Sequence, residues 1–225
     1  MMQELVYIQH TVFPSLMQGL GVSMLLILPS AICGLCLGVV AGTLQVFGSP
    51  MTRILVNGYV LFFRGFPLII QLYIWYFGLA RIGLFLSPYT ASVLGFSLCS
   101  AAYHCEYIRG ALLSIKHGQT AAAHALGFTR LQTLVSIILP QAMRRALPGC
   151  GNEIIYLIKY SSLAYMVTCI ELTGKAKILA SASFKYIEVF TIVGAVYLFL
   201  VTLASSLLNR LETRLVVPGF ERYKS

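Results

Sequence analysis

Long hydrophobic runs separated by short polar stretches make up most of this chain. Four runs are nearly free of charge: about Ser15 to Val46, Ile54 to Leu79, Tyr89 to Ile108 and Val189 to Leu208. A helix of about 20 apolar residues is long enough to cross the hydrocarbon core of a bilayer. We therefore predict that each of these four runs is a transmembrane helix.

The stretch from Ile137 to Ile170 is also apolar, but prolines, glycines and charged residues interrupt it. We expect Pro148, Gly149 and Gly151 to break a helix here and to expose free backbone carbonyls. Irregular backbone at membrane depth is tolerated where it is buried in protein or lines a cavity. We count one broken span here, which makes five spans in the whole chain. Hydropathy alone can return only four, because it can miss this one. The predicted fold class is an all-α integral membrane protein with five transmembrane helices.

Composition supports this class. Hydrophobic residues make up 58% of the 225 residues and charged residues only 10%, whereas soluble domains carry about 25% charged residues. The size indicates one bundle, a single domain over residues 1–225. A net charge of +9 would suggest nucleic acid as the partner of a soluble protein. Here the basic residues flank apolar runs, which indicates the lipid bilayer and no nucleic acid.

The basic residues also orient the five spans. With the N-terminus outside, ten Lys and Arg residues lie on the inner side and five on the outer side. The inner ones are Arg53, Arg109, Lys116, Arg130, Arg144, Arg145, Arg210, Arg214, Arg222 and Lys224; the outer ones are Arg81, Lys159, Lys175, Lys177 and Lys185. The positive-inside rule then places the N-terminus outside and the C-terminus in the cytoplasm. The N-terminal stretch has no basic n-region or cleavage site, so we expect the first span to be retained.

On this topology, residues 109–137 form one long cytoplasmic loop. Thr120 to Leu126 is strongly helix-forming, Gly127 is placed to stop that helix, and Thr129 is placed to cap a second one that Pro140 ends. The loop thus reads as a helix–turn–helix with a smooth alanine surface that another protein can approach. An ordinary loop between two spans fits the same residues equally well.

A resemblance separates these two interpretations. The three alanines at 121–123, then Gly127, Ile137, Leu139 and Pro140, match the spacing EAA-x3-G-x9-I-x-LP and resemble the EAA loop of ABC importer permeases. The stretches 62–78 and 100–163 resemble the polar amino acid branch of that family. Within the branch, residues 152–172 and the closing Phe-Glu-Arg at 220–222 most resemble the M-type permease of arginine importers.

The resemblance implies an ABC transporter type-1 transmembrane domain in a bacterial inner (plasma) membrane. It implies three partners: a cytoplasmic ABC ATPase dimer, a second permease subunit (this chain or a sister permease) and an extracytoplasmic amino-acid-binding protein. The loop residues implied to couple to the ATPase are Gln119, Ala121, Ala122, Ala123, Gly127, Ile137, Leu139 and Pro140. The chain departs from the family pattern at Ala121, where Glu is usual, and at Tyr160, where Asp is usual.

The chain has no Walker A motif of its own. Its nearest imitation, Gly174-Lys175-Ala176, has Cys169 where the first glycine is needed and Ala176 where Ser or Thr is needed. We therefore expect ATP hydrolysis in a separate subunit, and in this chain no catalytic residues, no cofactor and no metal. Cys33 and Cys36 form a C-x-x-C, but we interpret them as small apolar residues inside a helix.

Candidate residues for a substrate pathway are the polar and aromatic groups within the spans. Glu153 and Asn152 follow the expected helix break, where transporter sites are commonly built. A cationic substrate would pair Glu153, but so would Lys159 or Arg145. The other candidates are Tyr103, Tyr156 and Ser161, although such residues more often pack helices together.

Two further charged groups lie within spans. Arg64 precedes Gly65 and Pro67, so it either faces the pathway or, as we favour, fixes a bend there. Glu106 lies three residues before Arg109, and we expect an ion pair between them.

The resemblance implies a permease subunit of an ABC importer for polar amino acids, with basic ones such as arginine favoured. The alternative is an ion- or proton-coupled secondary transporter that uses Glu153 as its relay, which leaves the loop pattern unexplained. An intramembrane enzyme would need a convergent set of nucleophile, base or metal ligands, and the sequence presents none.

Overall fold

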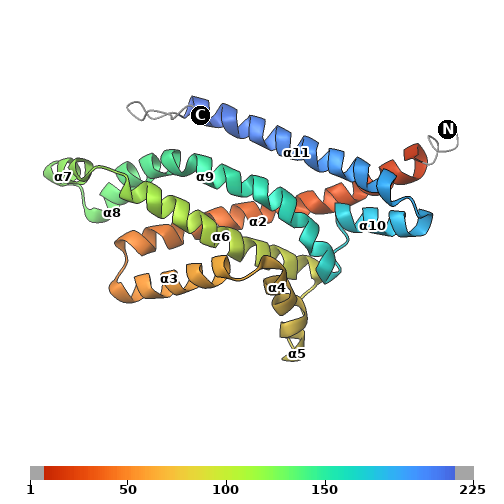
Figure 1. Ribbon diagram of the computed structural model, residues 1–225. Coiled ribbons are helices and arrows are strands. Elements are labelled where there is room, and N and C mark those ends of the chain that lie inside the picture. Colours follow the sequence, from red (N-terminus) through yellow and green to blue (C-terminus); the bar gives the residue numbers. More distant parts are fainter. Residues whose placement is uncertain (1–7, 216–225) are drawn as a thin grey trace.

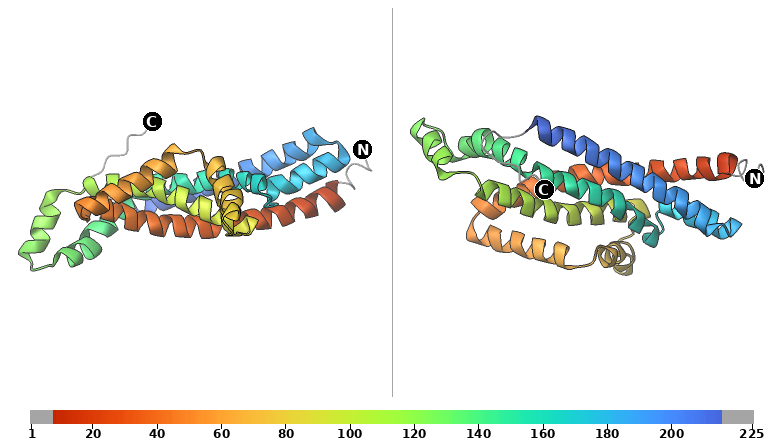
Figure 2. Two further views of the ribbon diagram at one scale, coloured as in Figure 1. Left: turned by 90° about the horizontal axis from the view of Figure 1, so that it is seen from below. Right: turned by 45° about the horizontal axis from the view of Figure 1, so that its top comes forward.

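A computed structural model describes residues 8–215, and every regular element in that range is a helix. The helices α2 (Phe13–Phe47), α3 (Pro50–Gly65), α6 (Pro88–Leu113), α9 (Leu139–Tyr160) and α11 (Tyr186–Arg214) lie lengthwise in an elongated bundle (Figure 1). At one end of the bundle lie α7 (His117–Ala125) and α8 (Arg130–Thr133), and α10 (Leu172–Ser183) lies towards the other end (Figure 2). The predicted all-helical class is confirmed.

The packing of α2 on α6 forms the centre of the bundle. Gly34, Gly38 and Gly42 are buried on one face of α2 and lie against α6. A Cβ at Gly34 would lie 2.9 Å from the side chain of Ser100, and a Cβ at Gly42 would lie 2.9 Å from the carbonyl oxygen of Cys105. The G-x-x-x-G spacing therefore brings two backbones together within this chain, as small residues do between membrane helices.

Two helices begin with the same local sequence, Ser-Pro-x-Thr. The Ser49 hydroxyl accepts a hydrogen bond from the Thr52 amide at 3.2 Å, and Ser87 accepts one from Thr90 at 3.1 Å. The proline at the first helical position has no N–H to leave unsatisfied. These caps start α3 and α6 directly after the turns that precede them.

The expected second span is sharply bent. Its first half is α3; its second half comprises α4 (Leu68–Tyr73), a π-helical turn (Ile74–Gly78) and α5 (Leu79–Arg81), and the two halves meet at 103°. Pro67 cannot donate a backbone hydrogen bond and forces Phe66 into extended conformation. The buried Gln71 side chain donates to the carbonyls of Phe63 and Phe66, at 2.9 and 2.8 Å, and so satisfies backbone groups at the bend.

The predicted break at Pro148 is wrong, because α9 continues through this proline as a regular helix. The neighbouring glycines allow close packing instead: a Cβ at Gly149 would lie 2.8 Å from the Tyr107 ring, and one at Gly151 would collide with Leu208. The break comes later, after a 3-10 helix (Ser161–Val167): the helical parts Arg130–Val167 and Leu172–Ser183 meet at 55° across the short connection between Val167 and Leu172.

The prediction that Pro140 ends the second loop helix is also wrong. A π-helical turn (Leu134–Ile138) joins α8 directly to α9, and Pro140 lies in the first turn of α9. The Gln141 side chain donates to the Ile137 carbonyl at 2.8 Å. The wider π turn and this side-chain bond accommodate a proline that has no N–H to contribute.

Within residues 8–215, two helices are long and apolar enough to cross a membrane, His10–Phe47 and Tyr186–Arg214. Counting each of the two bent pairs as one span raises this to four. The helix α11 starts near the N-terminal end of α2 and runs back towards α7 (Figure 1). Arg222, Lys224 and the Phe-Glu-Arg at 220–222, which entered the sequence predictions, lie outside the described residues.

Candidate functional site

The end of the bundle formed by α7 and α8 is shaped by a glycine turn. Gly127 has a φ of +83° and ends α7 in a Schellman motif: its own N–H donates to the His124 carbonyl at 3.0 Å, and the Phe128 N–H donates to the Ala123 carbonyl at 3.1 Å. Thr129 then caps α8 in a capping box with Gln132. Both helix ends are thus satisfied locally, which gives the turn a defined shape.

The residues predicted to couple to the ATPase lie around this turn and differ in how far their side chains are exposed. Gln119, Ala121, Ala122, Gly127 and Pro140 are exposed, Ile137 and Leu139 are half-buried, and Ala123 is buried. The turn also presents apolar side chains that the sequence prediction did not single out. Leu126 is 78% exposed and Leu131 69% exposed.

A cavity of about 460 Å³ lies beside these residues. It is lined by Phe47 from the end of α2, by Thr120 and His124 from α7, and by residues of α8 and the following π turn. The α7–α8 end therefore combines an exposed apolar tip with an adjacent hollow.

Three neighbouring cavities form a groove along α3 and α6, which we call the α3–α6 groove. The hinge cavity, about 450 Å³, lies at the bend after α3 and is lined by Arg64, Gly65, Cys99, Tyr103 and Tyr160, among others. The middle cavity, about 430 Å³, shares Arg64, Gly65 and Tyr103 with it. The end cavity, about 450 Å³, shares Gln45, Asn57 and Glu106 with the middle one. The shared lining residues place the three cavities side by side, from the bend towards the end of α3 that faces α7.

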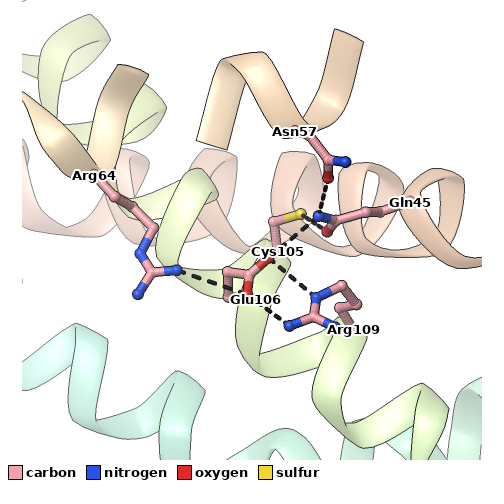
Figure 3. A network of polar contacts seen from close by, with 6 residues as sticks. All are labelled: Gln45, Asn57, Arg64, Cys105, Glu106 and Arg109. Atoms are coloured by element: carbon pink, nitrogen blue, oxygen red, sulfur yellow. Dashed lines mark hydrogen bonds and ion pairs between the residues drawn. The ribbon is translucent and has the colours of Figure 1, made fainter. Parts of the chain in front are cut away.

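A polar network crosses this groove and links three helices (Figure 3). Glu106 on α6 is at its centre, and Arg109 donates to both its oxygens, from Nε at 3.1 Å and from Nη2 at 2.9 Å. The i, i+3 ion pair predicted for these residues is confirmed. Gln45 on α2 donates to Glu106 at 3.3 Å and to Asn57 on α3 at 2.6 Å. Arg64 Nη1 lies 3.7 Å from Glu106 Oε2.

Arg64 and Tyr103 are the two predicted pathway residues that the structure brings together. The Arg64 guanidinium carbon lies 5.1 Å from the centre of the Tyr103 ring, a cation–π distance. Both residues line the hinge and middle cavities. Arg64 also stands at the bend that its R-G-x-P context predicted.

Glu153 is buried on α9, with 2% of its surface exposed. Neither of the intramolecular partners considered for it takes that role. Lys159 lies over the Tyr156 ring, 4.6 Å from its centre, and Arg145 donates to the Ser114 carbonyl at 2.6 Å. Among the described residues, the ion pairs formed by carboxylates belong to Glu106. Glu153 is therefore a buried acid that forms no salt bridge with another described residue.

The remaining predicted pathway residues point to different surroundings. Asn152 is exposed and lines none of the cavities above. Tyr156 stacks on Tyr160, with ring centres 5.8 Å apart, and Tyr160 reaches the hinge cavity. Ser161 is fully buried and donates to the Ile158 carbonyl at 2.8 Å, which is a helix-end contact.

Sequence reasoning missed Gln45, Asn57 and Glu171. The first two are amide side chains at the ends of apolar runs, and that polarity was the available signal. Glu171 is fully buried and accepts four hydrogen bonds: from the amides of Thr173 and Gly174, both at 2.9 Å, and from the Tyr197 and Ser23 hydroxyls at 3.1 and 3.3 Å. It ties α2, α10 and α11 together.

The described part of the chain contains no group of three or more His, Cys, Asp and Glu residues that could hold a metal ion. All six cysteines are free, and Cys33 and Cys36 are exposed on the surface of α2. The polar groups of the groove are guanidinium, carboxylate, amide and phenol, which can bind a polar solute.

Comparison with known proteins adds independent information. A model of the family described as "binding-protein-dependent transport system inner membrane component" matches residues 34–217. A probable amino-acid ABC transporter permease protein, YckA of Bacillus subtilis, is 37% identical over 202 residues, which cover 90% of this chain and 89% of the relative. The glutamine transport system permease protein GlnP of Escherichia coli K12 is 34% identical over 206 residues, covering 91% and 94%.

The fold is also similar to solved structures. A chain from a crystal structure of an amino acid ABC transporter with histidines superposes with a TM-score of 0.84 at 30% identity, covering 93% of this chain and 97% of that chain. The likeness extends over nearly the whole bundle.

Proposed function

Because the chain belongs to the family of binding-protein-dependent transport system inner membrane components, we propose that it is the permease subunit of an ATP-binding-cassette importer for polar amino acids. The family match and the amino-acid permeases among its relatives carry this proposal. The chain itself provides the passage and makes no covalent bond. Its substrate would be delivered by a binding protein outside the membrane.

The topology we propose has five spans, with the N-terminus outside and the C-terminus in the cytoplasm. The fifth span would be α6, whose 26 residues correspond to about 39 Å of helix at 1.5 Å per residue. The excess of basic residues on the α7–α8 side supports this orientation. The bilayer would then cover the exposed apolar faces of α2 and α11.

We assign ATPase coupling to the α7–α8 end. Gln119, Ala121 and Ala122 are exposed there, and the Schellman turn holds them in a fixed orientation relative to α8. Because α8 continues without interruption into α9, a force applied to the turn by a cytoplasmic ATPase dimer would move α9 as a rigid lever. A second permease subunit, a copy of this chain or a sister, would complete the translocation pathway.

We assign substrate passage to the α3–α6 groove and to Glu153 on α9. Basic amino acids are the favoured substrates, with arginine first, since Glu153 is a buried carboxylate without an ion-pair partner among the described residues. A buried charge is costly unless it is paired. The guanidinium or ammonium group of a basic substrate would supply the positive charge that pairs with Glu153.

The rival function, an ion- or proton-coupled secondary transporter, is separated from this one by its energy source. The permease would be co-purified with its ATPase, reconstituted in vesicles and supplied with the binding protein and labelled arginine or glutamine. We expect uptake that requires both ATP and the binding protein. Uptake that persists without the ATPase and follows an imposed ion gradient would favour the secondary transporter.

A further inference from the structure

Arg64 is only loosely paired with Glu106. Its guanidinium approaches Glu106 to 3.7 Å, which is beyond hydrogen-bonding distance. Arg109, by contrast, donates to the same carboxylate at 2.9 and 3.1 Å. With Gln45 as a further donor to Oε1, the oxygens of Glu106 are engaged without Arg64.

The surroundings of Arg64 leave its guanidinium accessible from the groove. Its side chain is 41% exposed, and it borders both the hinge cavity and the middle cavity. The next residue, Gly65, has no side chain, and a Cβ there would meet nothing within 4 Å. The Tyr103 ring lies against the guanidinium and orients it.

We propose that Arg64 binds the α-carboxylate of the amino acid as it moves between the hinge and middle cavities. This inference rests on the proposed function, and it names the substrate group that the groove recognises. A guanidinium presents its N–H donors as a planar fork that fits a carboxylate with two parallel hydrogen bonds. The α-carboxylate is common to every amino acid, so this contact is independent of the side chain.

The network lowers the free-energy cost of replacing Glu106 by a substrate carboxylate at Arg64. An arginine within a membrane span needs a counter-charge, and Glu106 provides one while the groove is empty. When a substrate carboxylate replaces Glu106 at Arg64, Glu106 keeps its two hydrogen bonds to Arg109. Neither charge is left unpaired at any stage, so the substrate is bound without a large barrier to its release.

A purely structural role competes with this proposal, because Arg64 at the end of α3 can act as a strut that fixes the bend. The two roles differ in their dependence on the ligand. A strut affects all ligands equally, whereas a carboxylate site affects only ligands that carry the carboxylate.

The test measures binding to the purified permease–ATPase complex in nanodiscs, without a binding protein, by ligand-observed NMR. The probes are arginine against argininamide and glutamine against glutaminamide, which differ only in the α-carboxylate. In the wild type we expect both acids to bind at least about tenfold more tightly than their amides, since a charge-assisted hydrogen bond is worth about ten- to a hundredfold in affinity. Arg64→Gln should abolish this preference and leave amide binding unchanged.

Arg81→Gln is the matched control, because Arg81 is exposed at the end of α5 and lines none of the three cavities of the groove. It should keep the wild-type preference. If Arg64→Gln does not fold, Arg64→Lys replaces it, and the lost fork geometry should reduce the preference at least about threefold.

Three results would overturn the proposal: no acid preference in the wild type, an unchanged preference in either Arg64 variant, or an equal loss for acids and amides. The measurement requires neither ATP turnover nor delivery by a binding protein. A complete complex that fails to import amino acids would therefore refute the proposed function without deciding this one.

Discussion

The turn at Gly127 offers a sharp test of the coupling surface, because the chain contains a second turn of the same geometry elsewhere. Gly127 has a φ of +83° and Gly83 a φ of +86°, and a Cβ at either position would meet nothing within 4 Å. Both end a helix in a Schellman motif, with the Gly83 N–H donating to the Ala80 carbonyl and the Leu84 N–H to the Leu79 carbonyl. Gly83 follows α5, on the segment that juts out from the bundle (Figure 1).

The cost of substitution at Gly127 comes from the backbone alone, since the added side chain enters open space. A left-handed conformation costs a residue with a Cβ about 1–2 kcal/mol, or roughly a five- to thirtyfold smaller population of the native turn. Gly127→Asn should cost least, because asparagine tolerates this region. Gly127→Leu should cost the full amount. Gly127→Pro should abolish the turn, because its φ is fixed near −65° and it removes the N–H that bonds to His124.

The assay is ATP turnover stimulated by the binding protein, together with co-purification of the ATPase, both normalised to folded permease. We expect coupling to fall in the order Asn, Leu, Pro at Gly127, while the same three substitutions at Gly83 leave it near the wild-type level. If Gly127→Pro folds and retains wild-type turnover and co-purification, this turn is not where the ATPase docks. An equal loss in the Gly83 series would instead indicate a general effect of strained turns on the permease.

Three further predictions concern topology, the buried acid on α9 and the cap of α10. An N-terminal tag should be labelled only from outside and a C-terminal reporter should be active only in the cytoplasm; both ends on one side would rule out five spans. Glu153→Gln should lower arginine uptake about ten- to a hundredfold relative to glutamine uptake, and an equal loss for both would assign Glu153 a structural role. Glu171→Ala should cost about 3 kcal/mol, or roughly 6–12 °C in melting temperature, whereas the exposed Glu188→Ala should leave it nearly unchanged.

The sequence predicted helix positions well wherever the local signal was unopposed. The runs around α2, α6 and α11 are long and apolar, and Gly127 was placed where the first loop helix ends. The predictions at Pro140 and Pro148 were wrong because a proline does not end a helix when its surroundings compensate. The compensation at Pro140 involves a π turn and the Gln141 side chain, which composition does not reveal.

The site was only partly predictable, because it depends on how separate helices are placed. Arg64 and Glu106 were recognised as charged residues within spans, and the i, i+3 spacing gave the ion pair with Arg109. Their common groove with Gln45 and Asn57 depends on three helices meeting side by side, and no spacing along the chain encodes that. The bend after α3 brings Arg64 to the groove, so a local signal had a consequence that only the fold made visible.

The buried and half-buried carboxylates of the bundle can be ranked by how completely the chain neutralises them. Glu171 accepts four hydrogen bonds, and Glu106 is paired with Arg109 and approached by Arg64. Glu153 is as deeply buried as Glu171, yet it has no ion pair among the described residues. A buried charge is costly unless it is compensated, so under the proposed function a cationic substrate group would pair with Glu153. Glu153 lies on α9, the helix that continues from the α7–α8 turn. A force applied to that turn would therefore also move Glu153. This connection would link the proposed site of energy input to the proposed site of cation recognition.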